Sequence, residues 1–102
     1  MHFEAIADLA VKSGCSEKLK IWFGEILPDT RSYDGCISVR VIQNQRDPNR
    51  MMLIGQWTSR EKWEKYISWR QERGDIAMLE SFVEGEVNLE CFDCFVEFRN
   101  PT

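Results

Sequence analysis

Apolar and polar residues alternate over residues 3–11, and this alternation predicts the first strand. Successive strand side chains point to opposite faces, so the odd-numbered positions, all of them apolar, fall on one side. They are Phe3, Ala5, Ala7, Leu9 and Val11. Glu4 and Asp8 fall on the other side, and Gly14 then breaks the pattern. The first strand is therefore expected to bury one face and to end before Gly14.

Beyond Gly14 the apolar residues recur at intervals of three and four, which is typical of a helix that buries one side. Ser16 is the predicted N-cap, and Pro28 is predicted to kink or end the helix. The stripe that this helix would bury consists of Leu19, Trp22, Phe23, Ile26 and Leu27.

Two further apolar runs predict a β-hairpin. Residues 36–44 contain a β-branched run that follows a turn at Asp34-Gly35, and residues 51–57 are almost wholly apolar. The polar stretch between them contains Pro48 and is predicted to be the hairpin loop. The two strands should therefore pair in antiparallel fashion.

The rest of the chain predicts a second helix, a short helical segment and a last strand. The helix extends from the Thr58-Ser59 cap to Gly74, the short segment covers residues 75–85, and the strand covers residues 86–98. The order β, α, β, β, α, β predicts one α+β domain over residues 1–102, with a ferredoxin-like fold and an antiparallel sheet.

The predicted sheet is apolar on both faces, although two helices can cover only one. Val39 and Ile42 point to opposite sides, as do Met52 and Leu53. In the last strand the apolar positions are odd-numbered before Asp93 and even-numbered after it, so a bulge or a change of neighbour is expected there. A homodimer is predicted, with a C-terminal arm that contacts the other subunit.

The composition argues against several classes of partner and of binding site. The net charge of −4 without a basic cluster argues against a nucleic-acid partner. Neither a leader pattern nor an apolar run of about 18 residues is present, so a cytoplasmic protein without a membrane partner is expected. Cys91 and Cys94 would lie about 10 Å apart on opposite faces of a strand, too far for a disulfide. The only histidine is His2, so no metal site is predicted.

Two short motifs carry a family resemblance. The segment from Thr30 to Cys36 contains Thr-Arg followed by Gly-Cys, and the segment from Gln56 to Glu61 contains a Trp before a helix. Together they resemble the antibiotic biosynthesis monooxygenase family, with matching element order over residues 3–98. The resemblance implies a dimeric α+β barrel in which two sheets face each other. It also implies a monooxygenase that oxidises a small aromatic or quinol substrate with molecular oxygen and no cofactor.

Some members of that family have no established activity, so a non-catalytic ligand-binding or structural dimer is the alternative. Tyr66 stands nine positions after Trp57, where the family often has a pocket-facing His or Trp. Gly55 stands where the family often has Glu, which removes one candidate acid-base group. Haem-degrading relatives need an Asn where this chain has Ala7, so haem degradation is disfavoured.

The candidate site residues are aromatic and basic. Tyr66 and Arg70 share one face of the predicted second helix, so we hypothesise that Tyr66 hydrogen-bonds a substrate oxygen and that Arg70 supplies positive charge. Pocket walls for binding the substrate are assigned to Trp57, Trp63 and Trp69. The competing interpretation makes the aromatic residues core and Arg70 a surface or ion-pair residue.

A second candidate pair is Arg40 with Asp93. Arg40 lies on a strand of the predicted hairpin and Asp93 on the last strand. The two could form a substrate-binding pair, or an ion pair on the sheet face of the dimer.

Overall fold

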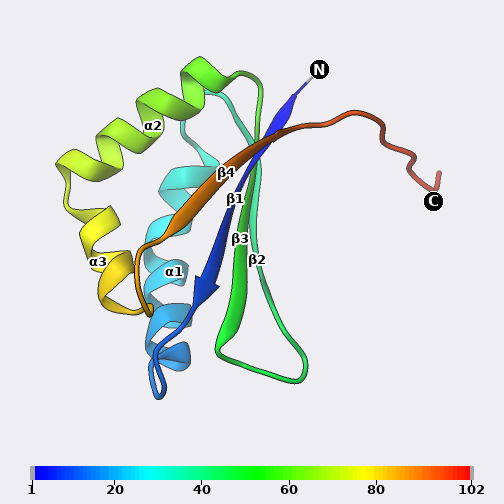
Figure 1. Ribbon diagram of the computed structural model, residues 1–102. Coiled ribbons are helices and arrows are strands. Elements are labelled where there is room, and N and C mark those ends of the chain that lie inside the picture. Colours follow the sequence, from blue (N-terminus) through cyan, green and yellow to red (C-terminus); the bar gives the residue numbers. More distant parts are fainter. Residues whose placement is uncertain (1, 102) are drawn as a thin grey trace.

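The alternating segment at the start of the chain forms β1, the strand on which the domain is built (Figure 1). The structure, a computed structural model, describes residues 2–101. Its elements are β1 (Phe3–Ala10), α1 (Ser16–Arg31), β2 (Cys36–Gln43), β3 (Arg50–Trp57), α2 (Arg60–Glu72), α3 (Asp75–Ser81) and β4 (Asn88–Asp93). The sheet is antiparallel with strand order β2-β3-β1-β4. The predicted ferredoxin-like fold is confirmed.

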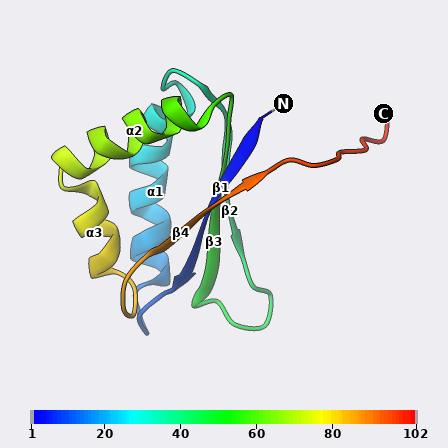
Figure 2. The same cartoon turned by 45° about the horizontal axis from the view of Figure 1, so that its top comes forward.

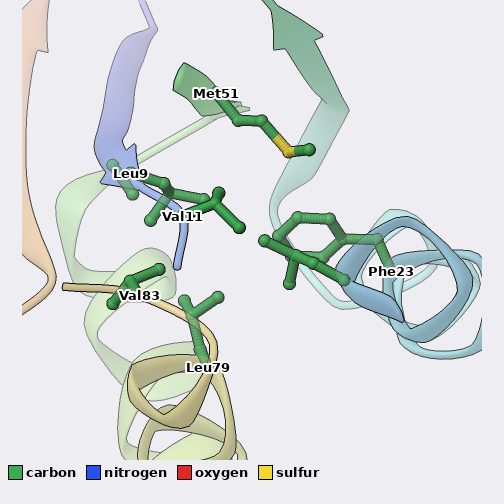
Figure 3. Packing of buried hydrophobic residues seen from close by; sticks show 8 residues of the cluster. Leu9, Val11, Phe23, Met51, Leu79 and Val83 are labelled. Atoms are coloured by element: carbon green, nitrogen blue, oxygen red, sulfur yellow. The ribbon is translucent and has the colours of Figure 1, made fainter. Parts of the chain in front are cut away.

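All three helices lie on one face of the sheet (Figure 2). The alternating apolar residues of β1 point toward the helices. Strand β3 pairs with β1, and Leu9 of β1 lies opposite Met51 of β3. Figure 3 shows Leu9 and Met51 converging with Phe23 of α1 and with Leu79 of α3. Toward the other end of the sheet a second cluster forms from Phe3, Ala5, Trp57 and Tyr66. The candidate site lies beside this second cluster.

Helix α1 differs from the prediction at both ends. Its N-cap is Cys15 rather than Ser16, without a side-chain capping bond. Pro28 does not end the helix, which continues to Arg31. A proline removes only one backbone hydrogen bond of the helix. The last turn is then held by the buried side chain of Thr30, which hydrogen-bonds to residues of α2.

Strand β4 is shorter than the predicted strand over residues 86–98. It pairs with β1 from Asn88 to Asp93, and Asp93 lies opposite Phe3, where β1 begins. Beyond that point β1 offers no further partner, and the chain leaves the sheet as an extended arm (Figures 1 and 2). The predicted change of apolar face at Asp93 thus coincides with the end of the strand. In the arm, Phe95 and Phe98 are more than 90% exposed.

The face of the sheet opposite the helices stays uncovered by the rest of the described chain. It carries apolar side chains that are roughly half exposed, among them Ile42 of β2 and Phe92 of β4. Ile6 and Ile54 lie between them on the central strands. The sequence prediction of a two-faced apolar sheet is therefore correct for the single chain.

Two further features of residues 2–101 concern membrane-spanning helices and the cysteine thiols. No helix in that range combines the length and the apolar character needed to cross a bilayer. All four cysteines are free. Burial raises the pKa of the Cys36 thiol, and also that of the Cys91 thiol, so both stay protonated and weakly nucleophilic at neutral pH.

Candidate functional site

A buried hydrogen-bonded cluster joins α1 to α2. Tyr66 and Arg70 are four residues apart on α2, so both point toward α1. The Tyr66 hydroxyl lies 2.6 Å from Oγ1 of Thr30, and Arg70 Nε donates to the Tyr66 hydroxyl at 3.0 Å. Arg70 is only 2% exposed, which is rare for an arginine. This cluster is the most unusual feature of the interior.

The guanidinium of Arg70 binds three helices together. Its Nη2 donates to the Ile26 carbonyl at 2.8 Å and to Thr30 Oγ1 at 3.0 Å, both in α1. Its Nη1 donates to Oδ2 of Asp75, the first residue of α3, at 2.8 Å. Arg70 also lies against the Trp69 ring, 4.6 Å from its centroid. The positive charge is consequently held in one position.

The ion pair between Arg70 and Asp75 favours the charged form of both side chains. Burial opposes the charge on Arg70, but hydrogen bonds to Asp75 and Tyr66 outweigh it and raise the pKa of Arg70. Burial likewise opposes the charge on Asp75, but hydrogen bonds from Arg70 and Arg73 outweigh it and lower the pKa of Asp75. Both groups are ionised at neutral pH, so Asp75 is a weak base and Arg70 a permanent cation.

The lowered pKa of Asp75 predicts a loss of stability in acid. Because the folded-state pKa lies below the unfolded value of 3.8, Asp75 stabilises the fold above that value. The contribution is lost as pH falls through the folded pKa. We expect the urea midpoint of the wild type to fall between about pH 4 and pH 2 more steeply than that of Asp75→Asn. Equal slopes for the two proteins would contradict the assigned ion pair.

The hydroxyl groups of Thr30 and Tyr66 carry one proton more than the buried cluster uses in hydrogen bonds. Thr30 and Tyr66 each carry one hydroxyl proton, and the bond between them uses only one of these. Arg70 donates to both oxygens and cannot accept. The other hydroxyl proton has no acceptor among residues 2–101. It can be donated to a ligand oxygen, from either residue.

A cavity of about 70 Å³ lies between the helices and the sheet, beside this cluster. Its walls are almost entirely apolar. They come from all three helices, from all four strands, and from Val87, which precedes β4. The polar groups that reach the cavity are Thr30, Tyr66, Arg70 and Asp75, together with the indole of Trp57. An apolar cavity with a few placed polar groups is the usual form of a small-molecule site.

Gly55 makes room for Trp57 on the floor of the cavity. A Cβ atom at Gly55 would lie 2.8 Å from Nε1 of Trp57, which is closer than such contacts allow. Gly55 and Trp57 both line the cavity. With glycine at position 55 the cavity wall has no acid-base side chain there, but it has room for a second donor, the indole N–H of Trp57.

Of the three tryptophans predicted to form the pocket wall, the structure places two in the lining of the cavity. Trp57 and Trp63 line the cavity. Trp69 does not line it, since its ring points outward, where it packs against Arg73 at 5.1 Å and against Tyr33 at 5.2 Å. Trp69 is therefore not part of the wall of this cavity, and it covers Arg70 from outside.

The predicted pairing of Arg40 with Asp93 is absent from the described chain. Arg40 lies in β2 and Asp93 in β4, which are the two outer strands of the sheet. Arg40 pairs with Ile54 on the open face, whereas Asp93 pairs with Phe3 on the helical face. Neither residue lines the cavity, because strand order and register separate both from it.

Sequence reasoning missed Thr30 and Asp75. Thr30 belongs to the Thr-Arg motif, but its contact with Tyr66 spans 36 residues and depends on how α1 packs on α2. Asp75 follows Gly74, whose φ of 82° turns the chain sharply between α2 and α3. An acid directly after a helix-ending glycine, five residues beyond a buried arginine, is the signal that could have indicated the pair.

Solved structures share this architecture. A conserved protein from Methanosarcina mazei Go1 has a TM-score of 0.83 at 15% identity, and the match covers 91% of this chain and 92% of that chain. A protein from Deinococcus radiodurans that carries the family name antibiotic biosynthesis monooxygenase has a TM-score of 0.80 at 14% identity, with 100% of each chain covered. At these identities the likeness establishes the fold.

The sequence itself establishes the family. No curated protein matches the chain significantly. The sequence profile of antibiotic biosynthesis monooxygenases, however, matches residues 3–71, which include β1, the hairpin and nearly all of α2. Because this match spans more than half of the sequence and ends just beyond Arg70, the chain belongs to the antibiotic biosynthesis monooxygenase family.

Proposed function

We propose that this protein is a cofactor-independent monooxygenase that oxidises a small aromatic or quinol-type substrate with molecular oxygen. One observation carries the proposal: an apolar cavity meets a hydroxyl pair and a fixed cation in the same place, formed by Thr30, Tyr66 and Arg70. Membership of the family supports the reaction class.

The cluster of Thr30, Tyr66 and Arg70 has the hydrogen-bond donors and the positive charge needed to bind a phenolic oxygen. The spare hydroxyl proton of the Thr30 and Tyr66 pair donates to that oxygen, and Arg70 lies 3.0 Å from both hydroxyl oxygens. A nearby cation stabilises the phenolate over the phenol, and the effect is stronger in a site from which water is excluded. Trp57 and Trp63 enclose the ring of the substrate. The anionic substrate is the electron-rich form that reacts with oxygen.

The reaction balances without an external electron donor. The phenolate gives one electron to O2, and the two radicals combine to form a carbon–oxygen bond. The O–O bond then breaks, one oxygen atom stays on the ring, and the other leaves as water. A hydroquinone and O2 thus yield a hydroxyquinone and water, with all four electrons supplied by the substrate. The protein's part is to bind, to orient and to exclude water.

Oxygen uptake tests the proposal. The purified protein is supplied with hydroquinones and with anthrone-like compounds in the presence of a chelator and without flavin. We expect one O2 consumed per substrate oxidised, at a rate proportional to protein concentration and above autoxidation in buffer. A rate equal to autoxidation for every compound would overturn the proposal.

A second function is favoured by the small volume of the cavity. A cavity of roughly 150 Å³ admits benzene in another protein, whereas this one measures about 70 Å³. A ring therefore enters only when lining side chains move apart. The second function is a non-catalytic ligand-binding or structural dimer, and its structural form needs no such movement. Saturable quinol binding without oxygen uptake, or no binding at all, would support this second function.

The uncovered sheet face supports a homodimer. The half-exposed apolar side chains Ile42 and Phe92 lie on it, and the arm beyond Asp93 carries Phe95 and Phe98 away from its own subunit. Apolar surface of this kind in a soluble protein is usually buried by a partner. A second copy of the chain, with its sheet facing this one, would cover the face and receive the arm.

Phe92→Glu is expected to weaken that dimer. Phe92 is 48% exposed in the single subunit, so the change leaves the fold intact but places a charge in the proposed interface. We expect a dimer for the wild type and a monomer for the variant in sedimentation at micromolar concentration. The matched control is Ile21→Glu on the outer side of α1, where Ile21 is 65% exposed, and it should remain dimeric. Equal masses for wild type and Phe92→Glu would contradict this interface.

A further inference from the structure

Three metal-binding side chains meet where the arm leaves the sheet. His2 precedes β1, while Cys94 and Glu97 follow β4, and the Cys94 amide donates to the His2 carbonyl at 3.3 Å. A ring nitrogen of His2, the Cys94 sulfur and a Glu97 carboxylate oxygen all lie within 4.8 Å of one another. Figures 1 and 2 show the arm passing beside the start of β1.

The chemistry of these three groups is that of a zinc site. Imidazole nitrogen, thiolate and carboxylate are the ligands that Zn²⁺ takes, often as three protein ligands with a fourth position open. In a tetrahedral site the donor atoms lie about 3.5 Å apart. The side chains therefore need to close by roughly 1 Å, which rotation about their own bonds can supply.

An unsatisfied atom points to the same place. Nε2 of His2 is buried and has no hydrogen-bond partner within residues 2–101. Buried polar atoms are nearly always paired, and a ring nitrogen of the same His2 belongs to the cluster, so an ion bound there would account for the unpaired atom. Glu97 does have a partner, since Arg99 Nε donates to its Oε2 at 2.6 Å, but the other carboxylate oxygen stays available.

We propose that His2, Cys94 and Glu97 bind a zinc ion that ties the C-terminal arm to the start of β1. The site lies apart from the cavity, whose lining includes none of the three residues. It depends on the end of β4, because the pairing of β4 with β1 brings Cys94 beside His2. The ion would set the direction in which the arm carries Phe95 and Phe98.

Cobalt substitution tests the site. Protein without an affinity tag is freed of metal by a chelator and titrated with Co²⁺, then with Zn²⁺. We expect one Co²⁺ per chain, a thiolate-to-cobalt charge-transfer absorption, and its loss as Zn²⁺ displaces Co²⁺. Cys94→Ser should abolish the absorption, and His2→Ala and Glu97→Gln should each raise the Kd by about tenfold or more.

Cys91→Ser is the matched control, since Cys91 lies three residues earlier in β4 and is not part of the cluster. It should keep the absorption and the affinity of the wild type. Circular dichroism verifies that each variant is folded, and all the changed side chains lie at the edge of the structure. Absence of the absorption in the wild type, or its persistence in Cys94→Ser, would overturn the proposal.

Discussion

Arg70→Ala is expected to destabilise the protein by about 3–5 kcal/mol. The change removes the group that pairs Asp75 and hydrogen-bonds Thr30, Tyr66 and the Ile26 carbonyl, all in the interior. The buried oxygens of Thr30, Tyr66 and Ile26 lose a charged donor, and Asp75 keeps only the exposed Arg73 as its partner, so the loss approaches that of a broken buried ion pair. Urea unfolding followed by circular dichroism measures the loss as a lower midpoint with an unchanged slope.

Arg73→Ala is the matched control for this prediction. Arg73 also pairs with Asp75, at 3.1 Å, but its side chain is 52% exposed, so its loss should cost less than about 1 kcal/mol. Arg70→Lys should fall between the two, because an ammonium group cannot make the same set of directed bonds. Equal losses for Arg70→Ala and Arg73→Ala would show that Arg70 does not hold the three helices together.

The second large effect concerns turnover, if the protein oxidises a quinol as proposed. Thr30→Val and Tyr66→Phe each remove one of the two hydroxyl groups that hydrogen-bond to each other. The hydroxyl that remains then has its proton free. Either variant thus keeps one donor for the substrate, and we expect each to lower kcat by about tenfold. The double variant keeps no hydroxyl donor and should lose roughly 10²- to 10³-fold.

Thr58→Val is the control for these rates, because it makes the same hydroxyl-to-methyl exchange on an exposed residue outside the cavity. Its kcat should equal that of the wild type. Steady-state oxygen uptake with one quinol measures all four variants. A double variant no slower than the singles would mean that the hydroxyl pair does not act on the substrate.

Local patterns in the sequence were enough to predict the elements and their arrangement. The alternation over β1 and the three-and-four spacing over α1 depend on residues close in sequence, so burial follows from position alone. The shared face of Tyr66 and Arg70 is predictable for the same reason, since both lie on one helix, whereas the hydrogen bond between them is seen only in the structure. The two-faced sheet and the change at Asp93 were also visible in the alternation.

The rest of the site depends on contacts between distant segments. Thr30 reaches Tyr66 only through the packing of α1 on α2. Of the two effects predicted for Pro28, a kink or an end, the end does not occur, because tertiary bonds hold the last turn of α1. The separation of Arg40 from Asp93 follows from strand order, which places β2 and β4 at opposite edges. His2 seemed isolated because its neighbours Cys94 and Glu97 come from the far end of the sequence.

The central claim is that a phenolic oxygen binds at the Thr30 and Tyr66 hydroxyls beside Arg70. A crystal structure with resorcinol, prepared without oxygen, tests it most directly, since a phenol cannot be oxidised in the absence of O2 and should stay bound. The account predicts the ring between Trp57 and Trp63, with one oxygen about 2.6–3.2 Å from Thr30 Oγ1 or Tyr66 Oη. Resorcinol bound only outside this cavity, or a cavity that stays closed at saturating resorcinol, would contradict it.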